Sequence, residues 1–171
     1  MKVFSLTFLL FLIASTVVSS QSLESFVEEK QAGLEYDEAK LVQVPGTNVK
    51  MIPPEYFQVD AGIKGFVHPG SACTIQVVEI QGVSHETIEN SMTEEHIANQ
   101  GYVYKDKIIT QTRKGKRAAC FVVSFVSEGI EYERIMMFTG DENTIWVNAN
   151  YPVELKKLLF PAIEAALLSV E

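Results

Sequence analysis

Three successive stretches of β-type sequence between residues 116 and 152 constrain the fold of this chain more than any other feature. They occupy residues 116–126, 130–139 and 144–151, and all three are rich in β-branched and aromatic residues. Apolar and polar side chains alternate at the start of the second stretch, and short polar turns at 128–129 and 140–143 separate the three. The pattern predicts an antiparallel meander at the centre of a sheet.

Further strands are predicted on both sides of this meander. Short strands fit residues 56–60 and 64–68, and longer ones fit 72–81 and 102–112. Residues 42–44 and 49–52 precede two adjacent prolines, which cannot donate to a sheet ladder, so this part is expected at a sheet edge or in an extended loop. The stretch 72–81 has apolar residues on both of its faces. The sheet is therefore expected to be covered on both sides.

Two stretches of helical periodicity can supply that cover. One spans residues 84–100, with Ser84 as its N-cap and Gly101 as its stop. The other spans residues 153–170 and carries eight apolar residues at helical spacing. These are Leu155, Leu158, Leu159, Ala162, Ile163, Ala166, Leu167 and Val170. Pro161 lies on the opposite side of this stretch, which predicts one helix kinked at the proline or two collinear pieces. The fold class expected is α+β, an antiparallel sheet with helices packed on both faces.

The N-terminal residues have the pattern of a secretory signal peptide. Lys2 is followed by an apolar run over residues 3–18 and then by small polar residues, which predicts a signal peptide over residues 1–20, cleaved after Ser20. An uncleaved anchor is the alternative. Residues 21–40 are acidic and predict a spacer or a short helix, and residues 41–171 predict a single domain. The protein is accordingly expected in the periplasm or outside the cell.

The charge of the chain narrows the classes of partner. With 22 acidic and 14 basic residues the net charge is −8. Such a surface repels phosphate backbones and anionic lipids, so neither nucleic-acid binding nor stable membrane insertion after signal cleavage is expected. His85 and His96 are eleven residues apart on one predicted helix and cannot share an ion. No metal site and no cofactor is predicted.

Several turns and strand ends resemble those of a known family. They are Pro53 to Phe57, the pair Gly65 and Phe66, Thr74 to Val77, the helix end at Gln100 and Gly101, and the segments 140–144 and 148–152. In this order they resemble the PsbP-like and DcrB-like proteins, over residues 41–170. The resemblance implies a three-layer α/β/α sandwich and an exported protein. Bacterial members mostly have no assigned reaction, photosynthetic members bind the oxygen-evolving photosystem, and distant relatives bind a small GTPase. The resemblance thus favours a docking role.

Catalytic candidates are few in this sequence. Cys73 and Cys120 are the only cysteines, and in an oxidising compartment they form a disulfide if their strands lie side by side; otherwise they are two buried thiols. A small hydrolase or thiol enzyme would use Ser71 or Cys120. Ser71 lacks the glycine spacing of a nucleophile elbow, and Cys120 stands in a strongly apolar strand where burial makes a thiol inert.

Two groups of residues are candidates for partner binding. Trp146, Asn148 and Asn150 share one face of a predicted strand, where an aromatic residue beside two amides can anchor a partner. The alternative is a tryptophan packed under a helix. Arg113, Lys114, Lys116 and Arg117 form a basic hairpin turn that either docks an acidic partner or is simply solvated.

Together these observations favour a non-enzymatic accessory or protein-binding module of the bacterial cell envelope. Its expected partner is another envelope protein. The sequence gives no indication of oligomeric state.

Overall fold

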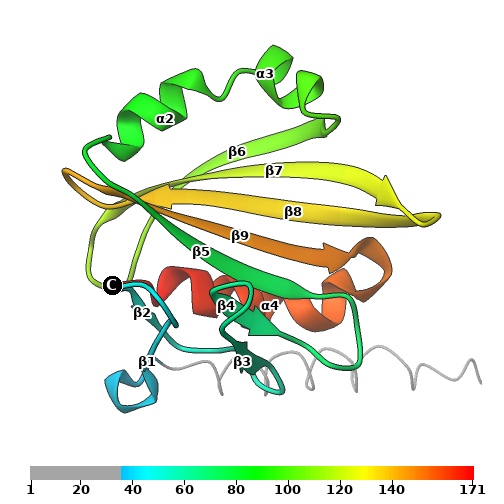
Figure 1. The fold of residues 1–171 in the computed structure, drawn as a ribbon. Helices are drawn as coiled ribbons and strands as arrows, with labels where there is room; N and C mark the ends of the chain where they lie inside the picture. The colour runs from blue at the N-terminus through cyan, green and yellow to red at the C-terminus, as the bar shows by residue number, and fades with distance from the viewer. Residues whose placement is uncertain (1–35) are drawn as a thin grey trace, which may run out of the picture. The chain divides into compact units, whose positions relative to one another are not determined.

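A computed structural model describes residues 36–171 of the chain. The predicted signal peptide and residues 21–35 of the predicted acidic spacer lie outside the described residues. From residue 36 onward the chain forms three layers, with one antiparallel sheet between α2 and α3 on one face and α4 on the other (Figure 1). This arrangement is the predicted one, and it confirms the α+β fold class.

The central sheet has seven strands in the order β3-β4-β5-β9-β8-β7-β6, and every neighbouring pair is antiparallel. The predicted meander is confirmed and makes up its larger part. β5 closes the meander by pairing with β9 along all seven of its residues. The strands are β3 (Gln58–Asp60), β4 (Gly65–Val67), β5 (Thr74–Ile80), β6 (Val103–Gln111), β7 (Arg117–Ser127), β8 (Ile130–Thr139) and β9 (Thr144–Pro152).

The segment before the two prolines does not join this sheet. β1 (Val42–Gln43) and β2 (Lys50–Met51) pair with each other as a separate two-stranded ladder, preceded by the short helix η1 (Glu38–Lys40). Backbone bonds between Lys50 and Glu171 tie β2 to the chain end instead. The physical reason is that Val44, Val49 and Met51 are buried among the residues that α4 covers, so the ladder is part of that layer.

The predicted helix over residues 84–100 is two helices, which corrects that prediction. α2 (His85–Ser91) begins at the N-cap Ser84, and α3 (Glu94–Asn99) begins at a second N-cap, Thr93. The Thr93 hydroxyl accepts a hydrogen bond from the backbone amide of His96 at 3.1 Å. A side chain that caps a new helix competes with continuation of the old one, so the chain breaks at Met92.

The predicted C-terminal helix is confirmed as η2 (Val153–Leu155) followed by α4 (Lys156–Leu168), which runs through Pro161. Its apolar residues are not all buried, however. Ile163, Ala166, Leu167 and Val170 are at most 3 % exposed, but Leu158 is 56 % exposed. The predicted eight-residue buried stripe is wrong at that position, because the side of α4 that packs on the core runs through Leu159, Phe160 and Ile163 and leaves Leu158 outside it.

Each face of the sheet has its own apolar core. Under α4 lie side chains of β5, β7, β8 and β9, including Ile75, Met137 and Tyr151. Under α2 and α3 lie Phe121, Met136 and Phe138, packed with Ile97 of α3. Because β7, β8 and β9 contribute to both cores, these strands are the centre of the molecule.

Candidate functional site

The predicted row of Trp146, Asn148 and Asn150 lies on the sheet face that α2 and α3 partly cover. Strand register gives each member two neighbours. Asn150 lies between Thr74 of β5 and Arg134 of β8, and Trp146 lies between Val78 and Phe138. The row therefore runs from a polar end at Asn150 to an apolar end at Trp146.

Arg134 occupies the polar end of the row and is held by several groups. Its Nε donates to Asn150 Oδ1 at 2.6 Å, and its Nη1 donates to the Tyr102 hydroxyl. Asn150 in turn donates from Nδ2 to Thr74 Oγ1 at 3.0 Å, so its amide orientation is set from both sides. The guanidinium of Arg134 on β8 is thus positioned by Asn150 of β9, which Thr74 of β5 holds in place. Tyr102, two residues after Gln100 at the end of α3, holds it from the other side.

Aromatic rings complete the surroundings of Arg134. The guanidinium carbon lies 4.9 Å from the centroid of the Tyr102 ring and 5.2 Å from that of Phe125. The Phe125 ring is stacked on Tyr132 with centroids 5.3 Å apart. Arginine above such ring faces gains cation–π attraction. We call Tyr102, Phe125, Tyr132 and Arg134 the aromatic–arginine cluster.

The apolar end of the row packs as the simpler alternative predicts. Trp146 stacks on Phe138 with centroids 5.6 Å apart and joins the core under α2 and α3. Its Nε1 is buried without a hydrogen-bond partner among residues 36–171, and so is Oδ1 of Asn148, a residue only 6 % exposed. Unsatisfied polar atoms of this kind are uncommon in folded proteins and leave hydrogen-bonding capacity unused inside the row.

The basic hairpin turn is largely neutralised by carboxylates of the same chain. Lys114 contacts Glu38 and, at 3.2 Å, Glu171, and Lys116 contacts Asp141 at 2.8 Å. Arg117 binds both carboxylate oxygens of Glu89, at 2.5 and 3.0 Å. Three of the four basic residues of the turn are thus paired with carboxylates of the same chain.

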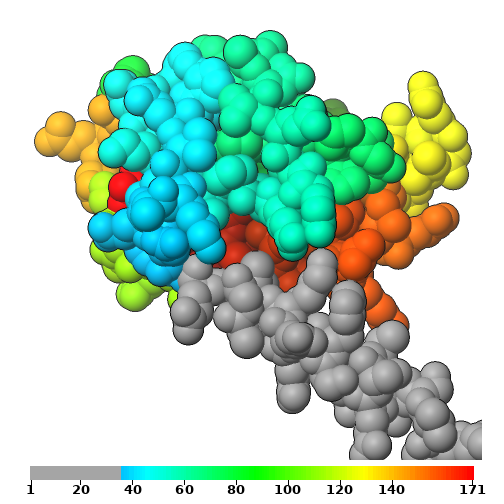
Figure 2. Space-filling model, turned by 90° about the horizontal axis from the view of Figure 1, so that it is seen from below, coloured from blue at the N-terminus to red at the C-terminus, as the bar shows by residue number. Residues whose placement is uncertain are grey.

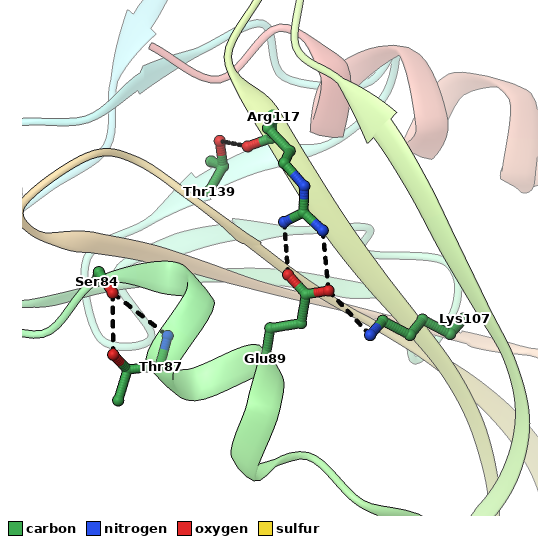
Figure 3. A network of polar contacts seen from close by, with 6 residues as sticks. All are labelled: Ser84, Thr87, Glu89, Lys107, Arg117 and Thr139. Atoms are coloured by element: carbon green, nitrogen blue, oxygen red, sulfur yellow. Dashed lines mark hydrogen bonds and ion pairs between the residues drawn. The ribbon is translucent and has the colours of Figure 1, made fainter.

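The Glu89 network connects α2 to the sheet edge (Figure 3). Glu89 is only 8 % exposed and accepts from Arg117 and, at 2.9 Å, from Lys107 of β6. The Arg117 hydrogen bonds, aided by Lys107 and opposed by burial, lower the pKa of Glu89 to about 2. Its role is structural, because the carboxylate is fully engaged by two cations of the fold.

Cys73 and Cys120 are both free and buried. Cys73 directly precedes β5 and Cys120 lies in β7, with β9 and β8 between these strands. Three strand spacings amount to about 14 Å, beyond the Cα separation that a disulfide spans. Burial, and to a lesser extent Glu164, raises the pKa of Cys120 to about 11. The disulfide alternative is therefore excluded in this fold, and the two-buried-thiols alternative holds.

Ser71 does meet a histidine. Its Oγ lies 3.0 Å from His68 Nδ1, within a turn in which the Ser71 amide also donates to the His68 carbonyl. Sequence reasoning had not paired these residues, although their separation of three positions is typical of a turn. A serine–histidine contact is one requirement for nucleophilic catalysis.

A pocket of about 410 Å³ opens on the α4 face, between α4 and the strands β6 to β9. At its centre Glu133 accepts from the Tyr151 hydroxyl at 2.6 Å and from Lys156 at 2.7 Å. Burial alone would raise the pKa of Glu133, but these two hydrogen bonds lower it overall. Since this carboxylate is satisfied by its own chain, the pocket gives less indication of a ligand than Arg134 does.

No protein-family model and no curated protein sequence matches this chain. Solved structures do match. LpqN of Mycobacterium tuberculosis, described as involved in cell envelope biogenesis, is similar with a TM-score of 0.56 and 12 % identity, over 73 % of this chain and 85 % of LpqN. The cyanobacterial PsbP protein CyanoP of Synechocystis sp. PCC 6803 is similar with a TM-score of 0.51 and 11 % identity, over 79 % of this chain and 94 % of CyanoP.

These likenesses establish the fold, and they confirm the predicted resemblance: the chain has a PsbP-like fold. Within residues 36–171, no helix is long and apolar enough to cross a membrane.

Proposed function

We propose that this protein is an exported, non-enzymatic accessory module of the bacterial cell envelope that acts by binding another envelope protein. The predicted signal peptide supports export. The fold supports the envelope, because LpqN, described as involved in cell envelope biogenesis, has a similar one.

The observation that carries the binding role is where exposed apolar side chains gather. Val103, Ile108 and Ile109 of β6 are 58 %, 44 % and 51 % exposed. Val126 and Ile130 flank the β7–β8 turn and are 69 % and 43 % exposed. β6 is an end strand of the sheet, and the β7–β8 hairpin (yellow) projects from the body of the molecule in the view from the α4 side (Figure 2). Strand register places Ile109 and Ile130 on the α2–α3 face of the sheet, and it places Val103, Ile108 and Val126 on the α4 face. Apolar residues on both sides of a free sheet edge indicate an edge that a partner covers. We call these five residues the β6 edge surface.

The experiment is cross-linking of the tagged protein in its source cell, followed by fractionation and mass spectrometry. We expect the protein in the envelope or outside the cell, with one envelope protein cross-linked to it. Ile109→Lys should abolish that cross-link, because a charge replaces a buried contact. Leu158→Lys on α4, where Leu158 is 56 % exposed, is the matched control and should retain it. A cytoplasmic protein, or equal cross-linking by both variants, would refute the proposal.

The contact between Ser71 and His68 favours a second candidate, a small hydrolase. A fluorophosphonate probe tests it, since the probe labels an activated serine and leaves an ordinary one unmodified. Labelling that disappears in Ser71→Ala would support hydrolysis. We expect no labelling, because the histidine meets the serine through a local turn, and its ring contacts Phe57 and has no carboxylate partner among the described residues.

A further inference from the structure

We propose that Arg134 is the recognition residue for a carboxylate group of the partner protein. This inference rests on the proposed function, because it assumes that a protein covers the neighbouring β6 edge surface. Arg134 lies on β8 four residues from Ile130, and on the same face of that strand. Tyr102, which contacts its guanidinium, immediately precedes Val103. Strand register places Arg134, Ile130 and Ile109 on one face of the sheet, and the rest of the β6 edge surface lies on the other face.

The first argument is that Arg134 is oriented but not saturated. A guanidinium has five N–H donors, and the contacts to Asn150 and Tyr102 use two of them. The remaining donors are on Nη1 and Nη2. The guanidinium lies over the rings of Tyr102 and Phe125, whose faces attract the cation without using its remaining N–H groups in hydrogen bonds. One N–H on Nη1 and two on Nη2 are thus left for an external acceptor, enough for a bidentate contact.

The second argument concerns charge. Arg117, the arginine in the Glu89 network, has its carboxylate from the same chain at 2.5 Å. Arg134 is only partly exposed, yet among residues 36–171 no carboxylate lies within ion-pair distance of it. Partial burial of a cation without an anion costs free energy that aromatic and amide contacts offset only in part. In a chain of net charge −8, a cation kept unpaired in this way indicates an external anion.

The third argument selects the class of anion. Both carboxylate and phosphate fit the arginine fork. A phosphate group carries up to two negative charges and is repelled more strongly by the acidic surface than a singly charged carboxylate. The aromatic rings of Tyr102 and Phe125 also lie at the guanidinium, and they suit the hydrocarbon part of a glutamate or aspartate side chain. A protein carboxylate satisfies both conditions.

The test uses the arginine Nε–H signals of the ¹⁵N-labelled protein. The chain has three arginines, so Arg113 and Arg117 serve as internal controls. The purified protein is titrated with propionate, with propionamide and with inorganic phosphate. We expect propionate alone to shift the Arg134 signal with saturation, while Arg117, already bound to Glu89, does not move. Arg134→Lys should weaken propionate binding at least about tenfold, because lysine cannot form the bidentate contact.

Three results would overturn the inference. They are an Arg134 signal that does not saturate with propionate, a stronger response to phosphate than to propionate, and an equal response of the exposed Arg113. The propionate titration is repeated on a variant in which four glutamates are changed to glutamine: Glu24, Glu28, Glu29 and Glu35. Tighter propionate binding by that variant would mean that the chain's own acidic segment occupies the site.

The cross-linking experiment distinguishes failure of the carboxylate inference from failure of the proposed function. In the cross-linking experiment we expect Arg134→Lys to lose the partner as Ile109→Lys does. If the partner depends on Ile109 but not on Arg134, the binding role stands and the carboxylate inference fails. If Ile109→Lys has no effect on cross-linking to the partner, the β6 edge surface is not the binding surface, whatever the result for Arg134→Lys.

Discussion

Single side chains in this protein differ mainly in whether the chain itself supplies their partners. Glu89 meets two cations, Glu133 meets a tyrosine and a lysine, and Arg134 meets amide and aromatic groups but no carboxylate from residues 36–171. The first two arrangements hold the fold together. The third leaves a positioned charge at the surface, from which we infer that the partner presents a carboxylate group.

Glu89 should make the stability of the protein dependent on acid pH. Its pKa is lowered from 4.5 to about 2, so its contribution is complete above pH 4.5 and is lost as the pH falls to about 2. We expect Glu89→Gln to lower the free energy of unfolding by about 1–2 kcal/mol at pH 7 and by almost nothing near pH 2. Urea unfolding at several pH values measures this. Glu95→Gln, at an exposed position, is the control; a constant difference across pH would contradict the assignment.

The thiol of Cys120 should be unreactive in the native protein. Burial raises its pKa to about 11, and the residue is 8 % exposed. We expect a disulfide reagent at pH 8 to modify Cys120 only after denaturant is added, when both cysteines should react. Mass spectrometry of the modified protein assigns the site. Rapid native labelling of Cys120 would instead support the thiol-enzyme alternative.

The secondary-structure elements show where the local sequence pattern is sufficient to predict the structure. Alternation and β-rich composition predicted the meander, and the structure places β8 at the predicted residues. The stretch 84–100 was harder, since Thr93 can be either a helical residue or a cap. Which of the two forms depends on whether one long helix or two short helices packed on the sheet give the lower free energy.

α4 offers a direct comparison of buried and exposed apolar residues on one helix. Ile163 is fully buried under the sheet, whereas Leu158 is 56 % exposed. We expect Ile163→Ala to lower the free energy of unfolding by about 2–4 kcal/mol, through lost burial and the cavity left behind. Leu158→Ala should change it by less than about 0.5 kcal/mol. Thermal or urea unfolding of both variants measures the two free-energy losses. Similar losses would mean that the helix packs through another face.

At the scale of the whole molecule, the central strands contribute to the cores on both faces, so we expect residues 36–171 to unfold as one unit. The predicted signal peptide gives a testable expectation for the proposed export. We expect the mass of the protein recovered from outside the cytoplasm to correspond to a chain starting at Gln21. A mass that includes residues 1–20 would show that the apolar run is kept as an anchor.

The sequence by itself determined the strand meander, the C-terminal helix, the resemblance to PsbP-like proteins and the shared face of Trp146, Asn148 and Asn150. All of these depend on residues close together in the chain, where the periods of strands and helices operate. Only the tertiary structure placed Thr74 and Arg134 beside Asn150, placed Tyr102 against Arg134, and separated Cys73 from Cys120. Such neighbours are set by which strand edges pair, and alternation along one strand carries no information about the strand that will lie beside it.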